Sequence, residues 1–149
     1  MNRQTLNRLI LEKRSCLCVG LDISSISFEP IRRIVEETAP YCVAFKANTA
    51  FFEAHGWKGW KCMEETVSYI RSRFPDHFLI ADAKRGDIGN TAVQYARTFF
   101  ERMDFDAVTL SPYMGYDAVE PFLAYRDKWV ILLALTSNTS AADFQFSLT

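Results

Sequence analysis

The chain has 149 residues, of which 49% are hydrophobic, and this is enough for one globular domain with a buried core. Its 17 basic and 18 acidic residues are mixed along the sequence, which excludes the basic surface of a protein that binds nucleic acid or anionic membranes. The longest apolar runs have strand length and the N-terminus shows no signal peptide or membrane span, so we expect a cytoplasmic protein.

The four cysteines are not spaced as metal ligands are. Three of them, Cys16, Cys18 and Cys42, lie in apolar segments with strand character. We therefore expect reduced, buried thiols and neither disulfides nor a metal site.

The sequence alternates strand and helix patterns. We predict strands at residues 16–22, 41–48, 78–84, 107–111 and 129–135. Helical periodicity predicts helices at residues 6–13, 29–38, 61–74, 88–103 and 118–125, whereas residues 139–149 show no clear period. Strands that alternate with helices indicate an α/β fold with a parallel sheet and right-handed crossovers.

Polar side chains follow the predicted strands where they end. These residues are Asp22, Lys46, Asn48, Asp82, Lys84, Ser111 and Ser137. A doubly wound sheet would carry a glycine-rich phosphate loop after its first strand, and residues 20–25 are no such loop. Polar residues at the C-terminal ends of several strands are instead typical of a (β/α) barrel.

The length of the chain sets a limit on this barrel. A complete TIM-type (β/α) barrel of eight units needs about 250 residues, so we expect about five of the eight units here. Residues 1–149 would then be the N-terminal portion of a single barrel domain, whose C-terminal units are absent from the sequence.

The segment from Ile80 to Ile88 concentrates charge at the end of the third predicted strand. Side chains alternate in a strand, so Asp82 and Lys84 project from the same face, and Asp87 follows after a glycine. Taken one at a time, these charges have a plain explanation, in which an ion pair forms at the strand end and Asp87 is the N-cap of the next helix. The combined pattern, Asp-x-Lys-x-x-Asp, favours a catalytic site.

Motifs along nearly the whole chain resemble those of the orotidine 5′-phosphate decarboxylases, and more narrowly their longer bacterial subgroup. They are Gly20-Leu21-Asp22, Phe45-Lys46-Ala47-Asn48, Asp82-Ala83-Lys84-Arg85-Gly86-Asp87-Ile88 with Thr91, Ser111-Pro112-Tyr113-Met114-Gly115 and Leu135-Thr136-Ser137-Asn138. The resemblance implies a lyase of de novo pyrimidine synthesis that decarboxylates orotidine monophosphate to uridine monophosphate without metal or organic cofactor. The family binds the substrate phosphate through its final βα units, including an arginine, and nothing here matches them. Activity of the 149-residue chain alone is therefore not expected.

The resemblance also assigns catalytic roles. The family's alternating charged array would consist of Lys46, Asp82, Lys84 and Asp87. Lys84 would protonate C6 of the pyrimidine as carbon dioxide leaves, with Asp82 near the departing carboxylate. A cation is needed there because the ring cannot delocalise the electron pair left on C6, and neighbouring carboxylates would keep the ammonium charged.

Substrate binding and assembly follow from the same resemblance. Asp22 and Lys46 would contact the ribose hydroxyls, Asn48 would belong to the same binding site, and Ser137 would hydrogen-bond the pyrimidine ring. Three further residues would be lent to the neighbouring subunit's site, which implies a homodimer: Asp87, Ile88 and Thr91.

Three other interpretations stay open. Magnesium-dependent sugar-phosphate decarboxylases and aldolases of the same superfamily carry a similar Asp-x-Lys-x-x-Asp, but with a metal ligand where this chain has Lys46. Lys84 or Lys46 could form a Schiff base in an aldolase. The chain could also be a catalytically silent half-barrel that only associates.

Overall fold

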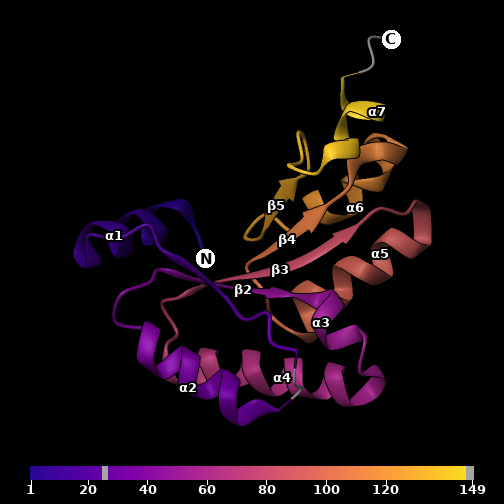
Figure 1. Cartoon of the computed structure of the whole chain (residues 1–149). Helices are drawn as coiled ribbons and strands as arrows, with labels where there is room; N and C mark the ends of the chain where they lie inside the picture. The colour runs from indigo at the N-terminus through magenta and orange to yellow at the C-terminus, as the bar shows by residue number, and fades with distance from the viewer. Residues whose placement is uncertain (25–26, 147–149) are drawn as a thin grey trace.

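The structure, a computed structural model, describes residues 1–24 and 27–146. Its centre is one sheet of five parallel strands in the order β1-β2-β3-β4-β5 (Figure 1). The strands are β1 (Cys18–Gly20), β2 (Ala44–Asn48), β3 (Phe78–Arg85), β4 (Ala107–Leu110) and β5 (Trp129–Leu132). Each strand pairs with the next one along the chain, which is the order of a barrel wall and not of a doubly wound sheet.

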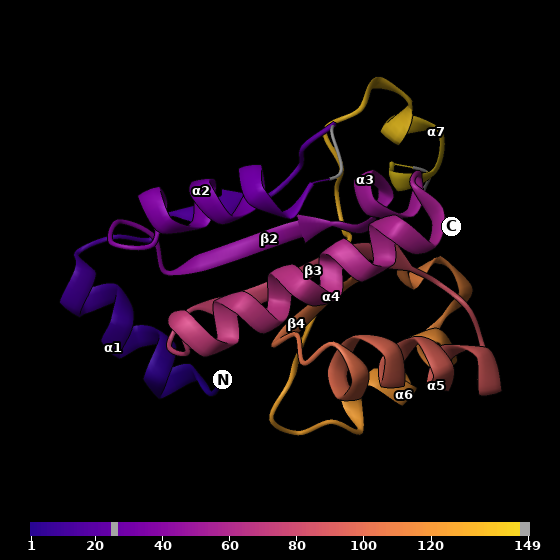
Figure 2. The same cartoon turned by 90° about the horizontal axis from the view of Figure 1, so that it is seen from below.

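The long helices between successive strands cover the outer side of the sheet, whereas the first helix lies at the N-terminal strand ends and the last one follows β5 (Figures 1 and 2). The helices are α1 (Arg3–Lys13), α2 (Phe28–Thr38), α3 (Thr49–Glu53), α4 (Gly56–Arg73), α5 (Gly89–Arg97), α6 (Glu120–Leu123) and α7 (Ala142–Gln145). A π-helical turn, Thr98–Arg102, continues α5, and short 3₁₀ turns span Pro112–Met114, Tyr116–Ala118 and Thr139–Ala141. None of the helices in the described ranges is long and apolar enough to cross a membrane.

Alternation along the strands divides the two faces of the sheet. On β2, Phe45 and Ala47 point to the outer side, where they are buried in the main core with helix residues such as Val35 and Met63. Lys46, between them, points to the inner face and is only partly buried. The main core therefore lies between the sheet and its helices, whereas the inner face carries the polar side chain of Lys46.

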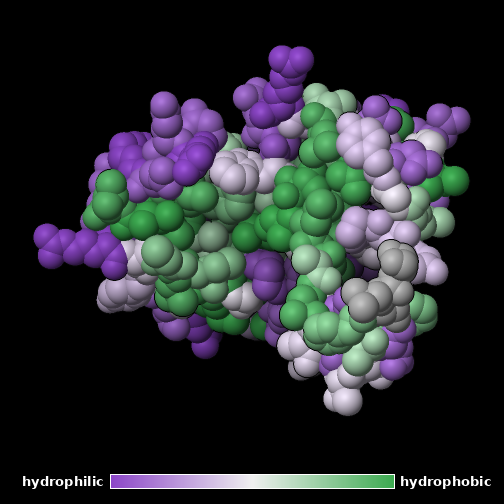
Figure 3. Space-filling view, turned by 90° about the horizontal axis from the view of Figure 1, so that it is seen from above, coloured by the Kyte–Doolittle hydropathy of each residue, from purple (hydrophilic) through white to green (hydrophobic). Residues whose placement is uncertain are grey.

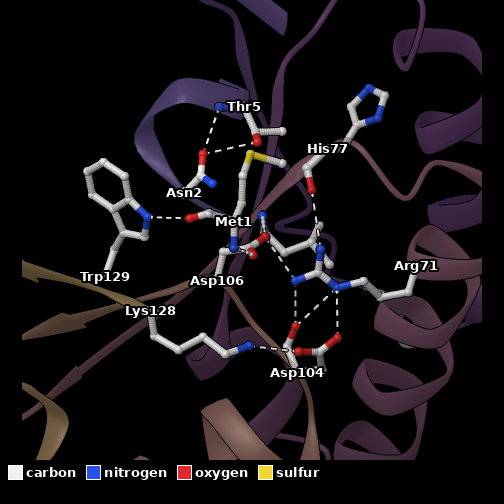
Figure 4. A network of polar contacts seen from close by, with 10 residues as sticks. Met1, Asn2, Thr5, Arg71, His77, Asp104, Asp106, Lys128 and Trp129 are labelled. Atoms are coloured by element: carbon white, nitrogen blue, oxygen red, sulfur yellow. Dashed lines mark hydrogen bonds and ion pairs between the residues drawn. The ribbon is translucent and has the colours of Figure 1, made fainter. Parts of the chain in front are cut away.

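The N-terminal ends of the strands are closed by α1 and a polar network. Leu9 of α1 packs against Val43, Phe78 and other apolar residues at this end of the inner face. The network is centred on Asp106, whose carboxylate contacts Arg71 at 2.8 Å and the Met1 amino group at 2.6 Å (Figure 4). These interactions tie the strands together at the end opposite to the polar strand ends that the sequence singled out.

Several local expectations are wrong. Cys16 and Cys18 are exposed, whereas Cys42 and Cys62 are buried, because Cys16 precedes β1 and Cys18 lies on this strand, which pairs on one side only in the described part of the chain. The polar tail contains a 3₁₀ turn and α7, although residues 147–149 lie outside the described part. Helix α3 was not predicted, and α4 begins earlier than residue 61.

Candidate active site

Four charged side chains meet at the C-terminal ends of β1, β2 and β3. Lys84 Nζ lies 2.7 Å from Asp82 Oδ1, and Lys46 Nζ lies 3.1 Å from Asp82 Oδ2. On its other side Lys46 Nζ lies 3.7 Å from Asp22 Oδ2. We call Asp22, Lys46, Asp82 and Lys84 the charged row, because acid and base alternate along it across three strands.

Asp82 is the centre of the charged row. Its side chain is only 11% exposed, and it accepts hydrogen bonds from Lys84 Nζ, Lys46 Nζ and Thr109 Oγ1. Burial by itself raises the pKa of this carboxyl, but the three donors outweigh burial and hold the pKa below its ordinary value. Asp82 is therefore an anion at neutral pH, in an orientation set from three directions.

Lys46 bridges the two carboxylates of the charged row. Partial burial lowers its pKa, but the hydrogen bond to Asp82 and the negative charges of Asp82 and Asp22 outweigh that effect and raise it above the ordinary value. Lys46 is therefore a permanent cation near neutral pH. A charged ammonium suits the binding of hydroxyl groups and anions, not the formation of a Schiff base, which needs the neutral amine.

Lys84 has an unusual backbone. Its φ is +47°, in the left-handed region, and the pairing of β3 with β4 shifts in register between Ala81 and Arg85. A non-glycine residue in this region costs of order 1 kcal/mol and persists only where its surroundings enforce it. Strain of this kind gathers at active sites, and here it lies on the residue for which the family resemblance implies the role of proton donor.

Thr109 of β4 completes this site and was not predicted. Its hydroxyl donates to Asp82 Oδ1 at 2.9 Å and accepts from the Lys84 backbone N–H at 2.9 Å. Side chains alternate in a strand, so Thr109 lies on the same face as Ser111, which was predicted at the end of the same strand. This alternation was the signal in the sequence that could have found Thr109.

The other predicted residues lie at varying distances from the charged row. Asn48 joins it through its backbone N–H, which donates to Asp22 Oδ1, while its side chain caps α3 by accepting from Ala50 N. Asp87 accepts from the N–H of Ile88 and, in the described part of the chain, makes neither a hydrogen bond nor an ion pair with Lys84. The N-cap of α5 is Ile88, so the alternative interpretation of Asp87 as that cap is wrong.

Ile88, Thr91 and Ser137 are exposed in this chain. Near Ser137, a cavity of about 650 Å³ lies between the loops that follow β4 and β5, and its lining includes Ser111, Tyr113 and Thr136. The structure thus brings Asp22, Lys46, Asp82 and Lys84 together. The side chains of Ile88, Thr91 and Ser137 are exposed and can make further contacts.

The inner face beside the charged row is open. Seen from above, hydrophobic residues run across the middle of this side of the molecule (Figure 3). Exposed apolar side chains lie at both edges of the sheet. Leu17, just before β1, is 49% exposed, and Leu132 and Leu135, at the end of β5 and after it, are 49% and 65% exposed. In the described part of the chain, β1 and β5 each pair on one side only.

Comparisons with known proteins agree on one family. The family model described as "Orotidine 5'-phosphate decarboxylase / HUMPS family" matches residues 15–149. Two curated relatives, the orotidine 5′-phosphate decarboxylases of Phocaeicola vulgatus and of Bacteroides fragilis strain YCH46, are each 55% identical over 99% of this chain. The chain spans 58% of the length of each of them.

Solved structures give the same result. The orotidine monophosphate decarboxylase structure from Leishmania donovani is 39% identical with a TM-score of 0.88, covering 98% of this chain and 58% of that one. A structure titled as a putative orotidine-monophosphate-decarboxylase from Toxoplasma gondii is 41% identical with a TM-score of 0.87, covering 95% of this chain and 51% of that one.

Proposed function

The chain belongs to the orotidine 5′-phosphate decarboxylase / HUMPS family, and on this premise we propose that it carries the catalytic charges of an orotidine 5′-phosphate decarboxylase. Its fold is five units of a TIM-type α/β barrel, as the sequence predicted. The proposed reaction converts orotidine monophosphate to uridine monophosphate without metal or organic cofactor. The observation that carries the proposal is the charged row at the C-terminal ends of the strands.

Lys84 is the proposed catalytic acid. When the carboxylate leaves C6, the remaining electron pair lies in the plane of the ring and cannot spread into it, so a fixed cation has to stabilise it. Lys84 can supply that charge and then the proton, which forms the new C6–H bond. The contact with Asp82 at 2.7 Å supports this role because it holds the ammonium in place before the reaction begins.

Asp82, Lys46 and Asp22 have supporting roles in the proposal. Asp82 lies beside the departing carboxylate and orients both lysines. Lys46 and Asp22 bind the ribose hydroxyls, for which an ammonium donor and a carboxylate acceptor 3.7 Å apart are suited. Asn48 contributes to the same part of the site, and Ser137 hydrogen-bonds the pyrimidine.

A homodimer would complete the site. Within the described residues, Asp87 accepts a hydrogen bond only from the neighbouring Ile88 N–H, and Ile88 is 47% exposed just before α5. In the proposed dimer, Asp87, Ile88 and Thr91 reach the neighbouring subunit's site, where Asp87 approaches that subunit's Lys84.

The phosphate of the substrate needs a site, and the proposal assigns none of these residues to it. We place it in further βα units, so that residues 1–149 form the N-terminal portion of one barrel domain. The unpaired edges of β1 and β5 and the apolar inner face support this arrangement, because barrels remove such edges. The same open edges favour one alternative for the chain by itself, which is association without catalysis.

The test uses residues 1–149 fused to the C-terminal units of the Phocaeicola vulgatus relative, which we call the completed barrel. We expect it to release carbon dioxide from orotidine monophosphate equally well with EDTA and with added magnesium. Activity that requires magnesium would favour the sugar-phosphate decarboxylase alternative. Trapping of a substrate carbonyl on a lysine by borohydride would favour a Schiff-base aldolase.

A further inference from the structure

Thr109 is a buried polar residue that contacts two members of the charged row. It is 7% exposed, and its hydroxyl is satisfied on both sides, by the Lys84 N–H as donor and by Asp82 Oδ1 as acceptor. A buried hydroxyl without partners would be costly, whereas a satisfied one rigidifies its neighbours. The hydroxyl therefore connects the backbone of one site residue with the side chain of another.

The first contact stabilises the bulge between β3 and β4. The pairing of these strands shifts between Ala81 and Arg85, and within this shift the Lys84 N–H donates to the Thr109 hydroxyl instead of a backbone carbonyl. Lys84 also has its φ at +47°. The Thr109 hydroxyl thus takes the place of a ladder acceptor where the backbone of Lys84 is strained.

The second contact fixes the carboxylate of Asp82. Its Oδ1 atom receives both Thr109 Oγ1 at 2.9 Å and Lys84 Nζ at 2.7 Å, while Oδ2 faces Lys46. Both lysine side chains are long and flexible, whereas Thr109 is a short β-branched residue on a central strand. Of the three donors to Asp82, Thr109 is therefore the one with the fewest ways to move.

We propose that Thr109 is a positioning residue of the decarboxylation, and that its hydroxyl sets the carboxylate of Asp82 and the backbone of Lys84 relative to each other. The proposal rests on the function proposed above, because it acts through Lys84 and Asp82. Thr109 does not itself touch the reacting atoms. Its loss should lower turnover and leave substrate binding nearly unchanged.

The test compares Thr109→Val and Thr109→Ser in the completed barrel. Valine keeps the shape and the strand preference but removes the hydroxyl, and serine keeps the hydroxyl. Thr66→Val is the matched control, because Thr66 is also buried and its hydroxyl donates only within α4, to the Cys62 carbonyl at 2.8 Å. Melting temperatures of the three variants show whether each one folds.

Two readouts are needed. Thr109→Val should lower kcat about tenfold with KM within about twofold, as expected when one hydrogen bond to a charged group is lost. The pKa of Asp82, followed by carbon-13 NMR of its carboxyl, should rise in the same variant. Thr109→Ser and Thr66→Val should match the unaltered protein in both readouts.

Three results would overturn the proposal: an unchanged Asp82 titration in Thr109→Val, an unchanged kcat, or equal losses in the valine and serine variants. If the unaltered completed barrel does not decarboxylate orotidine monophosphate, the proposed function fails. The Asp82 titration then still decides whether Thr109 positions that carboxylate.

Discussion

Replacing Lys84 by alanine in the completed barrel should lower kcat at least about a thousandfold, or about 4 kcal/mol in the barrier. A fixed charge at the reacting centre typically contributes about 10²–10³ and a general acid about 10²–10⁴. One ammonium performs both roles here, so the contributions do not simply multiply. The product of the two ranges would begin at about 10⁴, and a thousandfold is a lower bound set below it for that reason.

The structure separates this loss from a loss of stability. The Lys84 side chain is 49% exposed, so its truncation leaves no buried cavity, and Asp82 keeps Lys46 and Thr109 as donors. Lys61→Ala is the matched control, because this lysine is 65% exposed and, among the described residues, forms an ion pair only with Glu65 on α4. Lys84→Arg adds a second test, since arginine keeps the charge but does not release a proton near neutral pH.

The assay is steady-state turnover of orotidine monophosphate, with circular dichroism to show that each variant folds. We expect both Lys84 variants to be nearly inactive and Lys61→Ala to be unchanged. A Lys84→Ala variant within tenfold of the unaltered kcat would refute the assignment of Lys84 as the acid.

Three further predictions concern the dimer, the location of the phosphate site and the dependence of stability on pH. Mixing Lys84→Ala and Asp87→Ala completed barrels should recover about one quarter of the unaltered activity, since half of randomly paired dimers are mixed and one of their two sites is intact; verified exchange without recovery would exclude a shared site. The 149-residue chain alone should show no binding of uridine monophosphate by calorimetry, and micromolar affinity, about −8 kcal/mol, would place the phosphate site within it. Burial is the main cause that lowers the pKa of His77, so the folded state resists its protonation and should lose stability as pH falls below about 6.5. His77→Gln should flatten the fall in melting temperature between pH 7 and 5, while replacing the exposed His55 in the same way should not.

The five strands and the barrel wall could be predicted because their signals are visible in the sequence. Alternation with period two and the helical segments between strands predicted five strands, and the polar residues at the strand ends favoured a barrel over a doubly wound sheet. The contact of Asp82 with Lys84 follows from the same alternation. Predicted roles for individual site residues come from the family resemblance and stay predictions.

Features that depend on distant parts of the chain were missed. The positive φ of Lys84 and its bulge coincide with a hydrogen bond to Thr109, which is 25 residues away, and no pattern in the neighbouring residues indicates them. The exposure of Cys18 depends on what covers the inner face of the sheet, which an apolar pattern cannot reveal. Helix α3 has only five residues, too few to show a helical period.

The most direct test of the central claim is a crystal structure of the completed barrel with uridine monophosphate bound. The account predicts Lys84 Nζ within about 3.5 Å of C6, the distance expected for groups held ready to react. It also predicts Asp22 and Lys46 on the ribose hydroxyls, and Asp87 of the other subunit beside Lys84. A pyrimidine ring bound elsewhere, with C6 out of reach of Lys84, would contradict it.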